Sequence, residues 1–397
     1  MKSLKEKVQD VQRHLQKNGL DGWLLYDFQR RNELARDFLE IPAESFTTRR
    51  FFYWIPAKGD PVQIVHAIEP QVLEHLPGSK RIYLKWEELN NHIEETLKGS
   101  KRIAMEYSPR NALPYVSKVD AGVIDLVRSF GVEVCSSADF LQYYTCVLDE
   151  QQLASHMAAA EMLDKTVARA WQWIADALKA GRKATEYDVQ QFILQEFAAA
   201  GFISEGAPIC GVNAHSASPH YEPKQASSSM IKADDFILID LWCKQKKPRA
   251  VYADISRVGV AARIATGRQN EIFSIVRRAQ KSAADYVKER YGRGEIVKGC
   301  DVDKVSRQVI TAAGYGDFFT HRTGHNIYTK DHGPGTHIDS LETLDERPLI
   351  PRTCFSIEPG IYLPKEFGVR LEYDIYLEEK GNIRITGGTQ DAIVTLF

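Results

Sequence analysis

The 397-residue sequence lacks paired cysteine motifs, long apolar runs and an excess of charge of either sign. Its six cysteines stand apart, with no CxxC pair and no zinc-type spacing, a pattern typical of reduced thiols rather than a disulfide framework. No apolar stretch is long enough to span a bilayer, and the first residues lack the basic and apolar regions of a signal peptide. A formal net charge of −2 gives no reason to expect binding to nucleic acid or to an anionic membrane. These absences predict a cytoplasmic protein with neither partner.

The composition, 44% apolar and 26% charged, is that of a globular protein whose length allows two domains. In residues 1–150, short apolar runs alternate with helical stretches, which favours an α/β domain. Residues 151–397 begin with helices and become rich in strands after residue 236. The expected strands are 22–26, 50–55, 61–66, 81–84, 102–106, 132–134, 236–241 and 251–256, and the expected helices are 1–16, 86–97, 113–129, 151–180, 185–201, 269–291 and 301–313.

Four carboxylates interrupt or border apolar runs in the second half of the chain. Burying an isolated charge is strongly unfavourable unless the charge is paired or binds a metal. Several buried carboxylates close together would also repel each other and raise their own pKa values. Two divalent cations would resolve both conflicts, so the pattern predicts a dinuclear metallohydrolase. The residues are Asp240 in FILIDLW, Asp254 in VYADISR, Glu358 in FSIEPGIY and Glu372 in GVRLEYD, with His325 in HRTGHNI as a nitrogen donor.

Local patterns indicate how these side chains come together. The runs 236–241 and 251–256 are typical of a hairpin, which would place Asp240 and Asp254 on neighbouring strands. Alternation over 368–377 places Arg370, Glu372 and Asp374 on the polar face of a strand. Pro359 and Gly360 would end a strand just after Glu358.

Each residue alone also has a purely structural interpretation. An aspartate after an apolar strand, such as Asp240, is usually a turn former or helix cap. A single histidine such as His325 is more often a structural residue than a ligand. Glu372 taken alone is more simply a solvated strand residue or a salt-bridge partner of Arg370. The order and shared placement of all five residues favour the metal site.

The motifs ASPHY, LIDLW with YADISRV, HRTGH followed by His332, SIEPGIYL and GVRLE resemble those of the pita-bread metallopeptidases. This family includes aminopeptidase P, prolidase and methionine aminopeptidase. Residues 1–150 resemble the N-terminal domain shared by aminopeptidase P, prolidase and creatinase. The resemblance implies an α/β (α+β) fold, with a creatinase-like α/β domain at 1–150. It also implies a pita-bread catalytic domain at 151–397, with a curved, mostly antiparallel sheet flanked by helices.

The resemblance also assigns roles to individual residues. It implies that a hydroxide bridging two divalent ions attacks the scissile carbonyl, the ions being Mn²⁺ first, with Fe²⁺, Co²⁺ or Zn²⁺ as alternatives. Glu358 would carry the proton to the leaving amine, and His220 and His332 would donate hydrogen bonds to the substrate. His321 and Arg370 would lie at the substrate, Arg370 orienting the site or pairing with Glu372. The metal ligands carried over are Asp240, Asp254, His325, Glu358 and Glu372.

The function that the resemblance implies is an aminopeptidase acting on peptides with proline at the second position, in a homodimer. A prolidase-like Xaa-Pro dipeptidase is the alternative nearest to it. A metal-free, creatinase-like hydrolase of carbon–nitrogen bonds and a non-catalytic binding module remain as further alternatives.

The sequence departs from the family pattern at the expected pocket. Trp242 stands where the family has glycine, and we expect its ring to pack away from the cleft. A longer basic loop, 244–249, separates the two aspartates. In the stretch NIYTKDHG, Tyr328, Lys330 and Gly333 occupy positions where the family has a different pattern. The sequence therefore does not predict which substrates the pocket selects.

Overall fold

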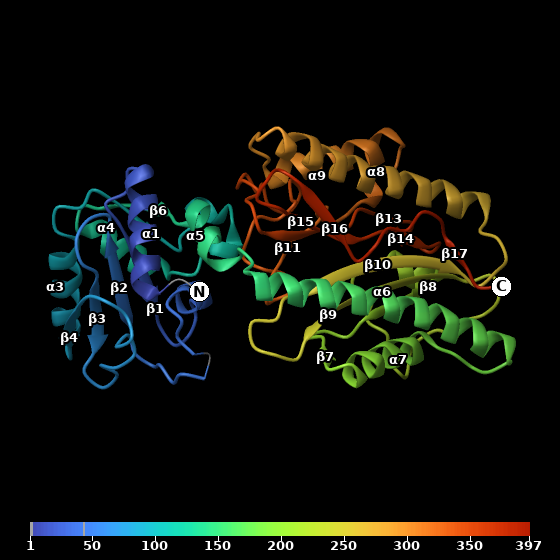
Figure 1. The fold of residues 1–397 in the computed structure, drawn as a ribbon, viewed down its shortest axis with the longest axis horizontal. Helices are drawn as coiled ribbons and strands as arrows, with labels where there is room; N and C mark the ends of the chain where they lie inside the picture. The colour runs from blue at the N-terminus through green and yellow to red at the C-terminus, as the bar shows by residue number, and fades with distance from the viewer. Residues whose placement is uncertain (1–2, 43) are drawn as a thin grey trace. The chain divides into compact units, whose positions relative to one another are not determined.

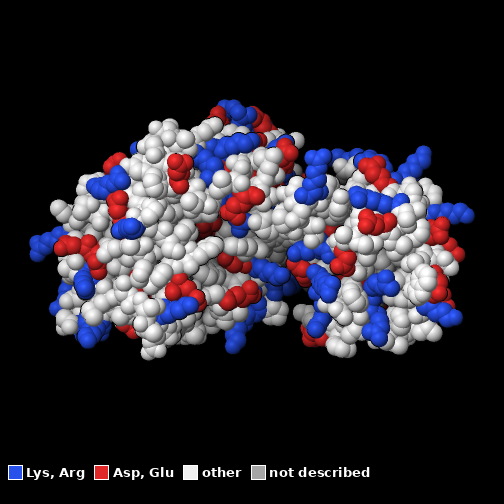
Figure 2. Space-filling view, turned by 180° about the vertical axis from the view of Figure 1, so that it is seen from behind, with Lys and Arg blue, Asp and Glu red and all other residues white. Residues whose placement is uncertain are grey.

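A computed structural model describes residues 3–42 and 44–397 (Figure 1). The chain divides into two compact units, Met1–Thr145 and Cys146–Phe397, whereas the sequence placed the boundary at residue 150. No helix in the described residues is long and apolar enough to cross a membrane. Basic and acidic side chains are interspersed over the face displayed in Figure 2, as expected from the small net charge.

Unit 1 is built on a six-stranded sheet with the strand order β4-β3-β2-β1-β5-β6. The strand β2 is antiparallel to its neighbours, and the other five strands run parallel to one another. The strands are β1 Gly22–Asp27, β2 Phe51–Pro56, β3 Val62–His66, β4 Ser79–Tyr83, β5 Arg102–Met105 and β6 Glu133–Ser136.

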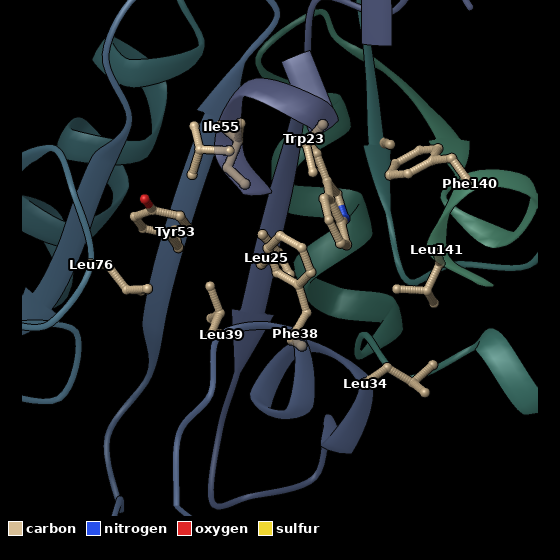
Figure 3. Packing of buried hydrophobic residues seen from close by; sticks show 14 of the residues in the cluster. Trp23, Leu25, Leu34, Phe38, Leu39, Tyr53, Ile55, Leu76, Phe140 and Leu141 are labelled. Carbon is tan, nitrogen blue, oxygen red and sulfur yellow. The ribbon is translucent and has the colours of Figure 1, made fainter. Parts of the chain in front are cut away.

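Helices cover both faces of this sheet (Figure 1). On one face, Trp23 packs against Phe38 and Phe140, with ring centroids 4.7 and 5.1 Å away (Figure 3). The helices on this face are α1 Leu4–Lys17, α2 Glu33–Phe38 and α5 Ala138–Thr145, and those on the other are α3 Trp86–Leu97 and α4 Ala121–Ser129.

One expected helix of unit 1 starts later than predicted, and two short helices were not expected. The helix expected over 113–129 starts only at Ala121. Before it, Pro114 opens a short 3₁₀ helix, Pro114–Val116, and another lies at Pro109–Asn111. Proline fits the first turn of a helix but not its interior, which explains the later start. The sequence pattern also missed α2 and α5, which are short.

Unit 2 packs its sheets between helices. The helices are α6 Glu150–Lys179, α7 Glu186–Ala199, α8 Gly267–Gly292 and α9 Gly299–Ala312, with short 3₁₀ helices at Asn213–Ala217 and Gly316–Phe318. The larger sheet contains β7 Phe202–Ile203, β8 Ile209–Val212, β9 Phe236–Gln245, β10 Ala253–Val260 and β17 Val394–Thr395. A second sheet has the order β11-β12-β15-β16, and β13 pairs with β14. These strands are β11 Asn326–Ile327, β12 Cys354–Ile357, β13 Gly360–Tyr362, β14 Gly368–Arg370, β15 Tyr373–Leu377 and β16 Ile383–Thr386.

The predicted hairpin is confirmed, and α7 begins with a capping box. The strands β9 and β10 pair antiparallel, with Asp240 opposite Ser256 and Asp254 opposite Trp242. The Thr185 side chain accepts from the backbone N–H of Asp188, and the Asp188 carboxylate accepts from that of Thr185.

Alternation along β9 and β10 decides which side chains reach the site. In both strands, one set of alternate side chains packs toward α6 and α7, and the other set points to the opposite face. Ile239 and Ile255 belong to the first set, and Asp240, Asp254 and Ser256 to the second. Both aspartates therefore lie on the face of β9 and β10 opposite to the one that α6 and α7 cover.

Candidate metal centre

Three of the predicted ligands meet inside unit 2. One ligand atom each from Asp254, His325 and Glu372 lies within 4.8 Å of the others, and all three side chains are buried. Asp254 lies on β10, His325 immediately precedes β11, and Glu372 lies between β14 and β15. One strand and two segments beside strands, from three sheets, thus supply one cluster.

The fourth predicted ligand, Asp240, lies beside this cluster and contacts a cation. Its Oδ2 accepts from Arg370 Nη2 at 2.5 Å, and its Oδ1 lies 2.7 Å from Ser256 Oγ. Ser256 Oγ is also 2.8 Å from Glu372 Oε2, although its single hydroxyl proton can be donated to only one carboxylate. Of the two roles expected for Arg370, pairing with Glu372 is not observed, because its ion pair forms with Asp240 on β9.

The fifth predicted ligand, Glu358, lies just after β12 and contacts His325. His325 Nε2 is 3.3 Å from Glu358 Oε1 and 3.7 Å from Asp254 Oδ2. Burial lowers the pKa of His325 well below its usual value, so the ring is neutral and carries one N–H. Its Nδ1 faces the carbonyl oxygen of Asn326 at 3.4 Å, which can only accept. Nδ1 therefore carries the hydrogen, and Nε2 presents a lone pair to two carboxylates.

The carboxylates themselves are held in an unfavourable environment. Burial is the largest cause that raises the pKa of Asp254 and of Glu372 well above the usual value, and neighbouring carboxylates raise both further. Burial also raises the pKa of Glu358 to about 7, although the charge of Arg370 opposes this. Ionising all of these carboxylates together is therefore unfavourable unless a further cation is present.

Buried carboxylate oxygens without hydrogen-bond partners also indicate an unfavourable environment. Within the described residues, one buried carboxylate oxygen on each of Asp254, Glu372, Asp331 and Asp374 has no hydrogen-bond partner. A buried polar atom without a partner is costly and calls for an explanation such as a bound ion. Hard carboxylate oxygens with one imidazole lone pair are a donor set that suits divalent cations. The residues present therefore fit a metal centre.

The three outer histidines occupy different positions. His220 is exposed and follows the 3₁₀ helix Asn213–Ala217. The His332 side chain is 57% exposed, and its ring centroid lies 4.1 Å from that of His325. His321 uses both ring nitrogens inside the protein, Nδ1 at 2.7 Å from Arg322 O and Nε2 at 2.7 Å from Tyr362 Oη. The geometry therefore favours a positioning role for His321 over direct contact with a substrate.

Sequence reasoning missed several polar groups at this centre. Asp374 Oδ2 accepts from the backbone N–H of Asp254 at 3.0 Å. Arg322 Nη2 lies 3.4 Å from His332 Nδ1, and Asp331 forms a possible cation-binding group with His325 and His332. The alternation that placed Glu372 on the polar face also placed Asp374 there, so the sequence contained a signal for Asp374. Asp331 lies in the stretch NIYTKDHG, for which no sequence pattern predicted a position.

Two expectations about the departures from the family pattern were wrong. The strand β9 continues through Gln245, so Lys244 belongs to the strand, and its Nζ donates to Thr329 O at 2.7 Å. Trp242 lies directly opposite Asp254, so alternation places its ring on the same face as that carboxylate rather than away from it. The ring packs against Gly206, where an added Cβ would lie 2.7 Å from Trp242 Cζ2.

A family model described as metallopeptidase family M24 matches residues 154–379, which contain every residue of this centre. The chain belongs to metallopeptidase family M24. It is 35% identical over 158 residues to an Xaa-Pro dipeptidase of Lactobacillus delbrueckii subsp. lactis, covering 40% of this chain and 38% of that protein. It is 24% identical over 349 residues to a probable dipeptidase PepE of Mycobacterium bovis, covering 86% and 84% respectively.

The fold is shared along nearly the whole chain. The solved structure of dipeptidase PepE from Mycobacterium ulcerans matches 99% of this chain and 98% of its own, with a TM-score of 0.75 and 21% sequence identity. The predicted pita-bread family and its mixed α/β architecture with an additional N-terminal domain are thereby confirmed. This M24 protein is a metallopeptidase by family.

Proposed function

We propose that this M24 protein is a metal-dependent Xaa-Pro dipeptidase. One observation carries the metal dependence: the neutral His325 ring directs a lone pair at Glu358 and Asp254, an arrangement that a cation between them would stabilise. The dipeptidase assignment rests on the names of the curated relatives, an Xaa-Pro dipeptidase and a probable dipeptidase.

The proposed ligands are the five predicted residues Asp240, Asp254, His325, Glu358 and Glu372. Two divalent ions held there, Mn²⁺ being our proposal, would polarise the scissile carbonyl and provide a water nucleophile at neutral pH. Asp331 and Asp374 add negative charge around the same region.

The remaining residues bind, orient and move protons. Glu358 Oε1 is engaged by Ser356 Oγ at 3.1 Å, which leaves Oε2 to receive a proton and pass it to the leaving amine. His220 and His332 are exposed enough to donate hydrogen bonds to a substrate carbonyl oxygen. Arg370 donates to Asp240 and to Tyr362 Oη at 3.1 Å, and we assign it the role of holding Asp240 in place.

The aminopeptidase first predicted from the sequence would use the same ligands. The two activities differ in whether the substrate ends in a free carboxylate directly after proline. Arg322 adds a cation beside His332, a group suited to that carboxylate, and so favours the dipeptidase. The metal-free hydrolase and the binding module are disfavoured, because neither explains a crowded set of buried carboxylates. The predicted homodimer and cytoplasmic location stay predictions.

The test compares hydrolysis of Ala-Pro with that of Ala-Pro-Ala, using protein reconstituted with Mn²⁺. We expect cleavage of the dipeptide, its loss with a chelator, and a loss of at least about a hundredfold in kcat for Glu358→Ala. The exposed residue Glu289, on α8, provides the control variant Glu289→Ala, which should match the wild type. Faster cleavage of the tripeptide would establish the aminopeptidase instead. Unchanged turnover by Glu358→Ala would contradict the role given to that carboxylate.

A further inference from the structure

Unit 1 contains a hollow of about 720 Å³ that the proposed peptidase function does not use. It lies where β1, β3 and β4 end and where α3 and α4 begin, and it is lined only by residues of unit 1. In open α/β sheets, ligands bind beyond the carboxyl ends of the strands. The hollow therefore occupies the position at which this type of sheet is expected to bind a ligand.

Cations outnumber anions among the charged residues that line this hollow. Arg31, Arg49 and Arg50 contribute three guanidinium groups, and among the lining residues Asp120 is the one carboxylate. Arg31 lies 3.6 Å from Asp120. Within residues 3–42 and 44–397, neither Arg49 nor Arg50 forms an ion pair within 4.0 Å. The Glu69 carboxylate lies near Arg49 and accepts from its backbone N–H at 3.1 Å, but it does not line the hollow. Both guanidinium groups thus border the hollow without a close ion pair among the described residues.

The Asp120 carboxylate is turned away from the helix that it precedes. Asp120 is the N-cap residue of α4, but its side chain makes no capping hydrogen bond. Its Oδ2 instead accepts from Tyr26 Oη at 2.9 Å. The first N–H groups of α4, at Ala121 and Gly122, therefore have no side-chain cap beside the arginines, and the helix dipole adds to the positive potential.

The rim of the hollow is apolar. Leu84 and Trp86 are 62% and 64% exposed, large fractions for such side chains. Phe28 also lines the hollow, with the Arg31 guanidinium 5.6 Å from its ring centroid. An exposed indole that lines the same hollow as three guanidinium groups is suited to a ligand that combines a flat apolar part with negative charge.

We propose that unit 1 binds a small anionic ligand, a carboxylate or a phosphate attached to an aromatic or apolar body, in this hollow. Arg49 and Arg50 bind the anionic group, and Trp86 packs against the body. A carboxylate and a phosphate present the same acceptor chemistry to guanidinium groups, so the experiment includes both.

The test is calorimetric titration of the full-length protein at low ionic strength with three probes. N-acetylphenylalanine carries a carboxylate, phenyl phosphate carries a phosphate, and N-acetylphenylalanine amide is neutral. We expect at least one anion to bind at least ten times more tightly than the amide, and its binding to weaken as salt is added. The tighter of the two anions identifies the head group.

Substitutions of the lining arginines test whether the ligand binds in this hollow. Losing one charge-assisted hydrogen bond weakens binding by roughly tenfold to a hundredfold, and we expect this for Arg49→Gln and Arg50→Gln. Arg50→Lys, which keeps the charge, should retain most of the affinity and shows that the fold tolerates a change at this position. Arg110, an exposed arginine of unit 1 outside the hollow, provides the control variant Arg110→Gln, which should bind normally.

Three results would overturn the proposal. The first is that none of the probes binds, and the second is that the amide binds as tightly as the anions. The third is that binding is lost in Asp254→Asn but kept in Arg49→Gln and Arg50→Gln, because the ligand would then occupy the acidic centre of unit 2.

Discussion

At the scale of single residues, the candidate metal centre depends on which charges have partners. Asp240 is neutralised by Arg370 at 2.5 Å, whereas Asp254 and Glu372 each keep a buried oxygen without a hydrogen bond among the described residues. The two kinds of carboxylate are therefore not equivalent. Those without partners gain most from a bound cation.

Replacing Asp254 by asparagine tests this difference. Mn²⁺ at about a hundred times its Kd stabilises a protein that binds it at one site by about 2.7 kcal/mol. We expect this stabilisation in the wild type and its loss in Asp254→Asn, because the variant lacks a buried anionic ligand. Thermal unfolding with Mn²⁺ and with a chelator measures both, and Asp285→Asn, at an exposed position on α8, is the control. Equal stabilisation of the wild type and Asp254→Asn would exclude Asp254 as a ligand.

A second buried carboxylate, Glu106 in unit 1, predicts a dependence of stability on pH. Burial raises its pKa to about 7 from 4.5, although hydrogen bonds from Asn32, Trp23 and Ser137 oppose this. Between these two pH values the folded state binds more protons than the unfolded state, so the free energy of unfolding falls as pH rises. At about 1.36 kcal/mol per pKa unit, Glu106 lowers the free energy of unfolding by roughly 3 kcal/mol in total. This fall is complete above pH 7.

Glu106→Gln isolates this contribution, because the variant has no group to titrate at that position. Urea unfolding at pH 5 and pH 8 should show the wild type losing roughly 3 kcal/mol more than Glu106→Gln on going to the higher pH. Equal losses for the two proteins would mean that Glu106 is ionised throughout.

At the scale of elements, short segments hold the ligands in register. Gly324 forms a bridge with Ile338, and His325, which follows it, is hydrogen-bonded to Ser356 through its backbone N–H at 3.0 Å. The Glu358 N–H donates to Thr323 O at 2.7 Å. These contacts couple the segment carrying His325 to the end of β12, which carries Glu358.

The close approach of these segments makes glycine necessary at position 324. A Cβ on Gly324 would lie 1.9 Å from the carbonyl oxygen of Ser356, so Gly324→Ala must displace His325 from β12. We expect a loss of about 1–3 kcal/mol in the free energy of unfolding, together with weaker Mn²⁺ binding. Gly267→Ala is the matched control, because a Cβ at Gly267 meets no atom within 4 Å. Urea unfolding and Mn²⁺ titration measure the two effects, and wild-type values in Gly324→Ala would contradict the packing argument.

At the scale of the whole molecule, each unit has its own hydrophobic core. Unit 1 contains two clusters, one on each face of its sheet, and the carboxylate cluster lies wholly in unit 2. Metal binding should therefore stabilise unit 2 selectively.

Hydrogen exchange measured by mass spectrometry tests this selectivity. Removing metal with a chelator should speed amide exchange in β9, β10, β12 and β15, because the repulsion between their carboxylates is then uncompensated. The amides of β1 and β2 should exchange at unchanged rates. Equal acceleration in both units would show that the ion stabilises the chain as a whole.

The sequence predicted most regular elements, because periodicity and helix caps are local properties. The strands β1 to β6, the helix α6 and the β9–β10 hairpin all follow from such patterns. The sequence did not predict α2 and α5, which are too short to show a period. It also missed Asp331 and Arg322, because both lie in segments without regular structure.

The sequence by itself determined that several acids would be buried together, because Asp240, Asp254, Glu358 and Glu372 lie in or beside apolar strands that must form a core. Only the tertiary structure decided which charge each acid meets. Arg370 reaches Asp240, 130 residues away in the sequence, because packing brings β14 against β9. Such pairings depend on the distance between strands of different sheets, which the local sequence does not encode.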